Sequence, residues 1–206
     1  HLDKKYISCS SNISCTKLAK YLHDNKQPGY EFLYGIPGTI AGAVSMNAGA
    51  FEREIMPYVH SIDLLDENGA IYTLKNNEIS YSYRTSNINE KSIIISVNLF
   101  KQKTNFDMNL LNLLNQKRKI SQPINQLSCG CIFKNPSGDY AARLIDSAQL
   151  KGSRAGGIYI SHKHSNYFIN DGSGTYIDFL VLLRRVKEVI ASKFSVKLDE
   201  EVILLK

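Results

Sequence analysis

Arg84 is the first of three side chains in this 206-residue sequence whose type and neighbours suit them to an anionic reaction centre. It follows Tyr81–Tyr83 and precedes Thr85 and Ser86. An arginine among hydroxyl groups is suited to binding a carboxylate or an enolate through its planar fork of N–H donors. The alternative interpretation is a solvent-facing loop arginine.

Cys131 and Glu201 are the other two candidates. Cys131 lies in the run Cys129–Pro136, beside a glycine and close to Lys134 and Asn135. A small protic side chain in such a polar setting could donate a proton to a bound ligand; the alternative is a buried structural thiol. Glu201 begins an apolar segment, 201–205, that we predict to be the last strand. Its carboxylate could serve the same centre, or it could be a solvated chain terminus.

A glycine-rich segment, Gly35–Phe51, is the strongest candidate for ligand contact. It holds glycines at positions 35, 38, 42 and 49 and few bulky side chains. Glycine permits sharp turns and close approach of backbone to a ligand, and free main-chain N–H groups can donate to an anion. The alternative interpretation is a small-residue turn packed under a helix.

The composition indicates a globular protein with an acidic partner. Hydrophobic residues make up 43%, charged residues 21%, and the net charge is +6. The positive residues are scattered apart from one cluster, Lys117–Lys119, and no nucleic-acid-binding motif is recognisable, so we expect no nucleic acid partner. The apolar runs 93–97 and 176–183 are too short to cross a bilayer, and no signal peptide opens the chain. We therefore expect a cytoplasmic protein without a membrane partner.

The four cysteines predict reduced thiols rather than a disulfide framework. They lie at positions 9, 15, 129 and 131, without a Cys-x-x-Cys pair. Cys129 and Cys131 could form half a zinc site, but a second pair of ligands is missing, so we expect no metal.

The elements that must position these residues alternate between strand and helix. Apolar patterning predicts strands over 5–9, 61–65, 71–74, 93–100, 128–133, 158–160, 166–169 and 201–205. It predicts helices over 17–22, 105–116, 139–145 and 175–193, the first capped by Ser14, and a hairpin turn at Asp66–Gly69. A shift in composition near 104 divides the chain into 1–103 and 104–206, in an α+β fold.

Several stretches together resemble the UDP-N-acetylenolpyruvoylglucosamine reductase family, in its short form without an inserted tyrosine-bearing loop. Nearly the whole chain is covered, and the motifs fall in the family's order. They are Gly35–Phe51, Tyr83–Ser86, Gln122-Pro123, Gly130–Pro136, Leu144–Asp146, Leu150–Gly152, Gly156-Gly157, Ser161–Asn170 and Leu198–Val202. The resemblance implies an FAD-binding lobe of the vanillyl-alcohol-oxidase type with a mixed sheet over 1–103, and a smaller α/β substrate-binding domain over 104–206.

The resemblance also implies a function. FAD, reduced by NADPH, would deliver hydride to the enolpyruvyl group of a UDP-sugar, giving UDP-N-acetylmuramate for peptidoglycan synthesis, and hence for cell wall biogenesis, cell shape and cell division. Arg84 and Glu201 would stabilise the substrate carboxylate and the developing enolate, and Cys131 would protonate the adjacent carbon. Lys119 and Asn135, with Arg84, would bind the substrate, and Lys117 and Arg118 would add to the field that attracts its pyrophosphate.

The FAD-binding residues implied by the resemblance lie in the glycine-rich segment and in one strand. They are Gly35, Ile36, Pro37, Gly38, Thr39, Gly42, Ala43, Asn47, Ala48, Gly49 and Ile94.

The chain departs from the family pattern at three positions. Cys131 stands where serine is usual, Gln149 where glycine is frequent and Ile203 where arginine is frequent. Family members also carry a glycine-rich lobe ahead of the position of His1, which grips the FAD pyrophosphate. We expect this chain to lack that lobe, as a fragment or the product of a broken gene. Two alternatives to the enzyme stay open: a non-catalytic remnant that cannot retain FAD, and a flavin-fold relative acting on another substrate.

Overall fold

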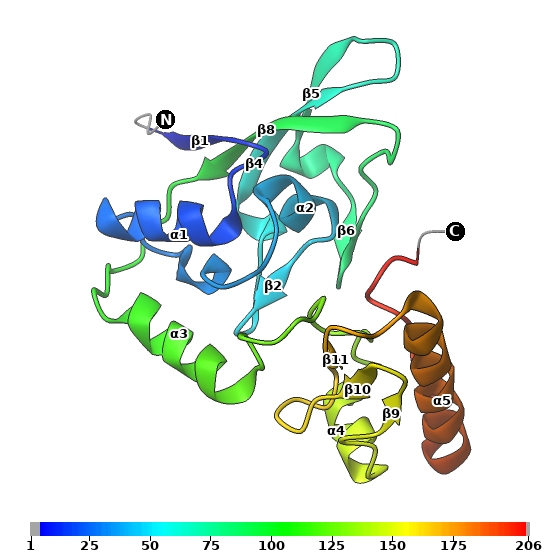
Figure 1. Cartoon of the computed structure of the whole chain (residues 1–206). Helices are drawn as coiled ribbons and strands as arrows, with labels where there is room; N and C mark the ends of the chain where they lie inside the picture. The colour runs from blue at the N-terminus through cyan, green and yellow to red at the C-terminus, as the bar shows by residue number, and fades with distance from the viewer. Residues whose placement is uncertain (1–4, 205–206) are drawn as a thin grey trace. The chain divides into compact units, whose positions relative to one another are not determined.

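The protein is an α+β chain of two compact units, seen in a computed structural model that describes residues 5–204 (Figure 1). The units are His1–Lys117 and Arg118–Lys206. The sequence predicted a division after 103, and the contacts divide the chain later. The reason is local packing, because His23 of the first unit bonds the Met108 carbonyl at 3.1 Å and stacks on Phe106.

The first unit is built on a four-stranded sheet in the order β1-β8-β4-β5. Every pairing in it is antiparallel, so the mixed sheet expected for this region is wrong. The strands are β1 (Tyr6–Ser10), β4 (Val59–Leu65), β5 (Ile71–Lys75) and β8 (Ile93–Phe100). The predicted hairpin between β4 and β5 is confirmed, since the Asp66 carboxylate accepts the amides of Asn68 and Ala70 and closes the turn.

Helices and short hairpins complete this unit. The predicted cap of α1 is confirmed, because Ser14 Oγ accepts the Lys17 amide at 3.2 Å. Apolar residues of α1 and α2 pack in one core with those of the sheet. The helices are α1 (Cys15–Asp24) and α2 (Ile40–Ser45), with 3₁₀ turns η1 (Glu31–Leu33), η2 (Met56–Tyr58) and η3 (Asn76–Glu78). A further helix, α3 (Leu110–Ser121), begins in this unit and ends in the second. The unit also has two short hairpins: β2 (Gly49–Ala50), at the end of the glycine-rich segment, with β3 (Arg53–Glu54), and β6 (Tyr81–Ser82) with β7 (Thr85–Ser86).

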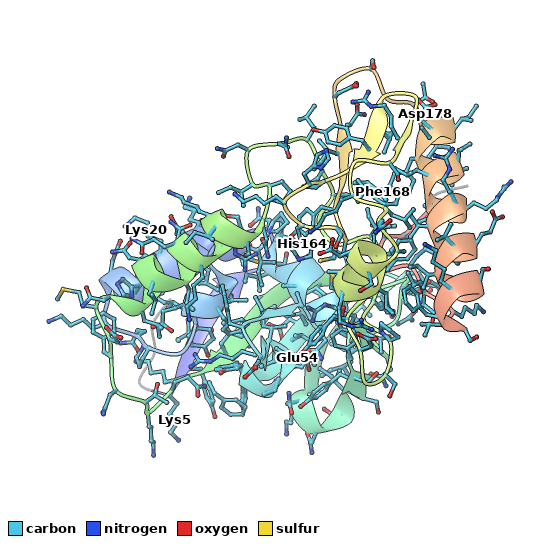
Figure 2. The ribbon with its side chains drawn as sticks, turned by 90° about the horizontal axis from the view of Figure 1, so that it is seen from below. Lys5, Lys20, Glu54, His164, Phe168 and Asp178 are labelled. Atoms are coloured by element: carbon cyan, nitrogen blue, oxygen red, sulfur yellow. The ribbon has the colours of Figure 1, made fainter. Side chains whose placement is uncertain are left out.

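The second unit packs two helices and a small antiparallel sheet, β11-β10-β9, around its own core. The helix α5 begins at a capping box, in which Thr175 and Asp178 bond each other's backbone amides. Figure 2 shows Asp178 at this helix end. The elements are α4 (Ala141–Ser147), β9 (Arg154–Ala155), β10 (Ile158–Ile160), β11 (Phe168–Asn170) and α5 (Tyr176–Phe194).

Two predicted strands of this unit do not form as strands. The segment 128–133 is irregular and makes only single bridges, Cys131 with Tyr167 and Phe133 with Glu200. Residues 201–204 contain no strand, and residue 205 lies outside the described residues. Gly130, with a φ of +90°, turns the backbone between the two thiols and interrupts the extended run. Over the described residues, no helix is both long and apolar enough to cross a membrane.

Candidate active site

Cys131 lies on a backbone segment held from two sides within the second unit. On one side, the Ile132 amide donates to the Asn166 carbonyl at 2.9 Å. On the other, the Glu201 amide donates to the Ile132 carbonyl at 2.8 Å. The predicted proton donor and the predicted carboxylate residue are therefore attached to the same short stretch of backbone. They come together from 70 positions apart in the sequence.

Tyr167 is the side chain that meets the Cys131 thiol. The two residues form an antiparallel bridge, and the Tyr167 hydroxyl is hydrogen bonded to the thiol. Burial, the nearby Cys131 and Glu201 raise the pKa of Tyr167, against the opposing charge of Arg118. The phenol therefore stays protonated and can donate to the sulfur.

Arg118 places a positive charge near Tyr167 and Cys131, and its side chain is buried within the second unit. Its side chain is 6% exposed and donates from Nη1 to Gln122 at 3.1 Å. Burial lowers the pKa of Arg118, and the neighbouring Tyr167 and Cys131 oppose that shift. The expected contribution of Arg118 to the field that attracts the substrate pyrophosphate stays a prediction. Its charge acts on Tyr167 and Cys131, which are both half-buried.

Glu201 is half-buried and also lines a hollow of about 680 Å³. The hollow is bounded by Cys129, Tyr176, Phe179 and the segment 201–204. The neighbouring acid, Glu200, has a different role, because its carboxylate pairs with Lys187 at 2.6 Å. The Glu201 carboxylate thus carries a negative charge that acts on Tyr167, whereas the Glu200 carboxylate ties the segment to α5.

Arg84 lies in the first unit, at the turn between β6 and β7, with a φ of +57°. Its guanidinium donates to two carbonyl oxygens of the glycine-rich segment, Gly49 at 2.9 Å and Asn47 at 3.5 Å. It also stacks on Tyr83 at 4.8 Å from the ring centre and lies 4.0 Å from the Glu54 carboxylate. The loop-arginine alternative does not fit, since the side chain is only 16% exposed.

The glycine-rich segment divides into an exposed part and a buried part. Pro37, Gly38, Thr39 and Gly42 are exposed, and Gly35 and Ile36 are half-buried. Gly38 has a φ of +97°, and a Cβ added there would meet nothing within 4 Å. This backbone therefore presents an open face, which favours the ligand-facing interpretation over packing for this part.

The other predicted FAD-binding residues hold that backbone in place. Ala43, Ala48 and Ile94 are buried in the core, and Gly49 is needed for close contact, because its Cβ would lie 2.1 Å from the Arg53 carbonyl. Asn47 is fully buried. Its amide donates to Glu54 and to the Ser82 carbonyl and accepts the Met56 amide. Packing is therefore the observed role of this part.

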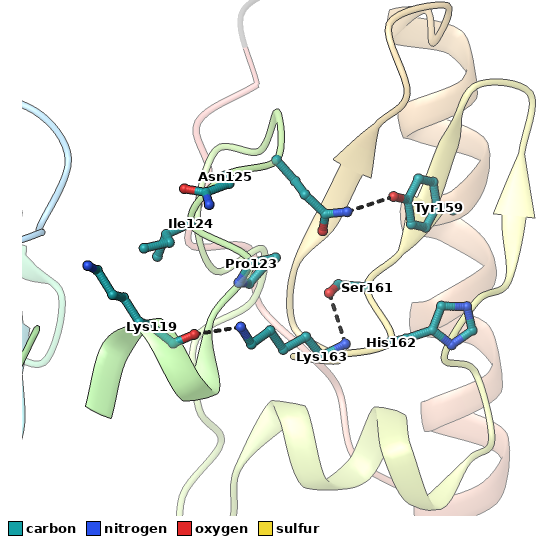
Figure 3. Close-up of a pocket in the computed structure, with 9 residues that line it drawn as sticks. Lys119, Pro123, Ile124, Asn125, Tyr159, Ser161, His162 and Lys163 are labelled. Atoms are coloured by element: carbon teal, nitrogen blue, oxygen red, sulfur yellow. Dashed lines mark hydrogen bonds between the residues drawn. The ribbon is translucent and has the colours of Figure 1, made fainter. Parts of the chain in front are cut away.

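Lys119 lines a pocket of about 570 Å³ in the second unit, which we name the Lys119 pocket (Figure 3). Lys163 reaches from the loop after β10 to donate to the Lys119 backbone carbonyl, and Gln126 donates to the Tyr159 hydroxyl at 3.2 Å. The pocket is lined by Lys119, Pro123, Ile124, Asn125, Gln126, Tyr159, Ser161, His162 and Lys163. Its two lysines and its amides suit an anionic, hydrogen-bonding ligand.

Asn135 does not line the Lys119 pocket. Its side-chain oxygen accepts the Ala141 amide at 3.1 Å, at the first residue of α4. A side-chain oxygen that satisfies an otherwise orphaned amide stabilises a helix start. The structure thus gives Asn135 a structural contact, and its predicted contact with substrate stays a prediction.

The cysteines are free thiols, and in the first unit Cys15 is buried and Cys9 is half-buried. Burial raises the pKa of both Cys9 and Cys15 to about 11, so these thiols stay protonated. Within residues 5–204, no group of three or more His, Cys, Asp or Glu side chains could hold a metal ion.

Sequence reasoning missed Tyr167 as a functional candidate, although it lies in the motif Ser161–Asn170. Nothing local connects it to Cys131, because the pairing joins residues 36 positions apart. The one available signal is a phenol next to the apolar pair Phe168-Ile169, where a polar atom that becomes buried needs a partner.

The known proteins that are similar to this chain and are described below all have the same name. The family model "UDP-N-acetylenolpyruvoylglucosamine reductase, C-terminal domain" matches residues 122–205. The UDP-N-acetylenolpyruvoylglucosamine reductase of Fusobacterium nucleatum subsp. nucleatum is 36% identical over 205 residues, covering 100% of this chain and 73% of that protein. The protein of the same name from Caldanaerobacter subterraneus subsp. tengcongensis is 38% identical, covering 95% of this chain and 66% of that protein.

A solved structure is similar as well. The crystal structure of UDP-N-acetylenolpyruvylglucosamine reductase from Thermus caldophilus aligns with a TM-score of 0.78 and 30% identity. The alignment covers 91% of this chain and 68% of the crystallised one. The chain thus spans between 66% and 73% of the length of these three proteins.

Proposed function

This chain is an oxidoreductase that belongs to the UDP-N-acetylenolpyruvoylglucosamine reductase family, and we propose that Cys131, Glu201 and Arg84 carry its reaction. The proposed reaction reduces the enolpyruvyl group of UDP-N-acetylglucosamine enolpyruvate to give UDP-N-acetylmuramate, a precursor of peptidoglycan. The observation that carries the proposal is the backbone contact between Glu201 and the Cys131 segment, at 2.8 Å. It brings a protic group and a carboxylate together inside the region that the family model matches.

The first unit has residues that fit FAD. The exposed backbone of the glycine-rich segment is open at Gly38 and carries only small side chains beside it, as a large flat ligand requires. Gly35–Thr39 and Gly42 would contact the cofactor, and Ala43, Asn47–Gly49 and Ile94 would hold their backbone. We propose that this lobe is of the vanillyl-alcohol-oxidase type. Bound FAD, reduced by NADPH, supplies the hydride that adds to the methylene carbon of the enolpyruvyl group.

Cys131 is proposed to supply the proton that balances this hydride. The thiol gives its proton to the carbon that bears the carboxylate, so the double bond becomes a single bond and Cys131 is left as a thiolate. Water then returns a proton to the sulfur. A thiol is a stronger acid than the serine hydroxyl usual at this position, so the exchange keeps the donor chemistry.

Arg84 and Glu201 are proposed to control charge on the substrate. The Arg84 guanidinium would pair with the substrate carboxylate, and Glu201 would orient the reacting group, so that charge is stabilised where it develops. The Lys119 pocket is the proposed contact for part of the UDP moiety, together with Asn135. We propose a cytoplasmic location for this reaction, and a resulting role in cell wall biogenesis, cell shape and cell division.

Two substitutions at Cys131 test the proposal in the purified protein. Cys131→Ala is expected to lower the rate of NADPH oxidation with the enolpyruvyl UDP-sugar by about a hundredfold or more. Cys131→Ser keeps an exchangeable proton and serves as the matched control, with turnover within about tenfold of the parent. A Cys131→Ala protein with near-normal turnover overturns the donor assignment. A parent protein without flavin absorbance overturns the cofactor assignment.

A further inference from the structure

Tyr167 is fixed against the Cys131 thiol by three separate sets of contacts. The backbones of the two residues form a bridge, and the Ser161 amide donates to the Tyr167 carbonyl at 2.9 Å. The Tyr167 ring packs edge-on against His164, with ring centres 4.7 Å apart. The adjacent Asn166 side chain bonds both the amide and the carbonyl of Phe133, at 3.0 and 2.8 Å. The hydroxyl therefore meets the thiol from a rigid support.

Charged groups surround the pair from other elements. Arg118 acts from the end of α3, and Glu201 acts from the segment after α5. His164 lies against the phenol ring, and burial lowers the pKa of His164 below its ordinary value, which favours its neutral form. The positive charge of Arg118 acts on both Tyr167 and Cys131, whereas the negative charge of Glu201 acts on Tyr167.

We propose that Tyr167 is a positioning residue for the Cys131 proton donor. Its hydroxyl donates to the sulfur, so it holds the thiol in one rotamer and stabilises the thiolate that remains after proton transfer. This inference rests on the proposed function, in which Cys131 gives the proton. The hydrogen bond gains strength as negative charge develops on sulfur, so it lowers the barrier more than it stabilises the ground state.

A Tyr167→Phe substitution separates this role from packing. Phenylalanine keeps the ring that packs on His164 and removes only the hydroxyl. The first readout needs neither cofactor nor substrate: the rate of alkylation of Cys131 by iodoacetamide, followed peptide by peptide by mass spectrometry across a pH series. Loss of the donor disfavours the thiolate, so the midpoint of the alkylation profile is expected to shift to higher pH.

The second readout is steady-state turnover of the holoenzyme. We expect Tyr167→Phe to lower kcat by about tenfold and to leave KM within about twofold, since the lost interaction forms mainly in the transition state. Tyr72→Phe is the matched control, because it also removes a hydrogen-bonded phenol, whose partner is Ser92 at 3.0 Å in the first unit. It is expected to change neither the alkylation profile nor kcat.

Three results would overturn the inference or its premise. An unchanged alkylation midpoint in Tyr167→Phe shows that the hydroxyl does not act on the thiol. A shifted midpoint with unchanged kcat shows that the contact does not serve the reaction. If Cys131→Ala keeps its turnover, the proposed function fails, whereas the alkylation result still decides the contact between the two residues.

A second substitution covers the case in which Tyr167→Phe fails to fold. A ring-fluorinated tyrosine introduced at position 167 keeps the shape of the side chain and makes its hydroxyl a stronger donor. It is expected to shift the alkylation midpoint of Cys131 to lower pH. A shift to higher pH, or none, overturns the inference.

Discussion

The Arg84 guanidinium donates to the Gly49 carbonyl oxygen at 2.9 Å, and this bond joins a predicted catalytic side chain to the glycine-rich segment. The two lie on neighbouring hairpins, Arg84 between β6 and β7 and Gly49 at the start of β2. The Nη2 donor of Arg84 therefore has a structural role, because its hydrogen bond fixes the backbone of the segment that we propose to face FAD. Substitution of Arg84 should affect folding and chemistry separately, and the two effects can be measured apart.

Arg84→Ala and Arg84→Gly are expected to lose turnover equally but stability unequally. Both remove the hydrogen bonds to Gly49 and Asn47, which costs about 1–3 kcal/mol of unfolding free energy. At a φ of +57° glycine is unstrained, so Arg84→Gly should be about 1 kcal/mol more stable than Arg84→Ala. Denaturant unfolding measures the stabilities, and NADPH oxidation measures turnover, which should fall by about a hundredfold or more in both.

Equal stability of the two Arg84 variants would contradict the left-handed backbone at this turn. Near-normal turnover in either would instead remove Arg84 from the proposed reaction and leave it a structural residue.

Gly38→Ala tests whether the open backbone of the glycine-rich segment contacts flavin. A Cβ at Gly38 meets no protein atom within 4 Å, so any effect beyond backbone strain must come from a ligand. Gly69→Ala is a matched control, since Gly69 also has a positive φ, +82°, and open space, but lies in the β4–β5 hairpin turn. Both variants should lose about 1 kcal/mol of stability.

Flavin content distinguishes the two glycine variants. Gly38→Ala is expected to retain less flavin per protein, read from visible absorbance after desalting, whereas Gly69→Ala should retain as much as the parent. Equal flavin content in both would show that Gly38 does not face the cofactor.

The sequence was informative where the signal is local. Asp66–Gly69 predicted the β4–β5 hairpin, Ser14 the start of α1, and periodic apolar residues the helix at 175–193, found as Tyr176–Phe194. In each case the residues that specify the structure are within a few positions of one another. Gln149, where the resembled family frequently has glycine, adopts a φ of +60°, which explains that preference.

Sequence reasoning failed where the structure depends on distant partners. The run 128–133 has the apolar pattern of a strand, but Gly130 turns it and only isolated bridges to Tyr167 and Glu200 form. Likewise, Arg118 belongs to the basic cluster Lys117–Lys119 in the sequence, and no local pattern indicates that it is only 6% exposed in the fold. The Tyr167 contact with Cys131 is also long-range, so no local pattern could reveal it.

Glu201→Gln is expected to lower kcat by about a hundredfold while leaving the second unit folded. The segment is held by the Glu201 backbone amide, which a glutamine keeps. Glu200→Gln is the matched control next to it. Its carboxylate pairs with Lys187 and both side chains are partly exposed, so the loss is about 1 kcal/mol of stability or less. Turnover in Glu200→Gln should be unchanged, and an equal fall in both variants would mean that charge near the chain end, rather than Glu201, matters.

His164 gives the second unit a pH dependence with a defined sign. Burial, aided by the charge of Lys151, lowers the pKa of His164 below its ordinary value of 6.5, against an opposing backbone hydrogen bond. Its Nδ1 accepts the Asn166 amide at 3.3 Å, which requires the neutral ring. Below about pH 6.5 the unfolded chain protonates this histidine while the folded chain does not, so unfolding takes up a proton.

The free energy of unfolding is therefore expected to fall as pH drops below about 6.5, and to fall less in His164→Asn. The Asp171 carboxylate does not interfere in this pH range. Hydrogen bonds from the Ser173 hydroxyl and Arg154 lower its pKa to about 2, so its contribution to stability is lost only at lower pH. Denaturant unfolding from about pH 7 down to about pH 5 isolates the histidine. Identical slopes in the parent and in His164→Asn would mean that the ring protonates without unfolding, and that the bond to the Asn166 amide does not hold it neutral.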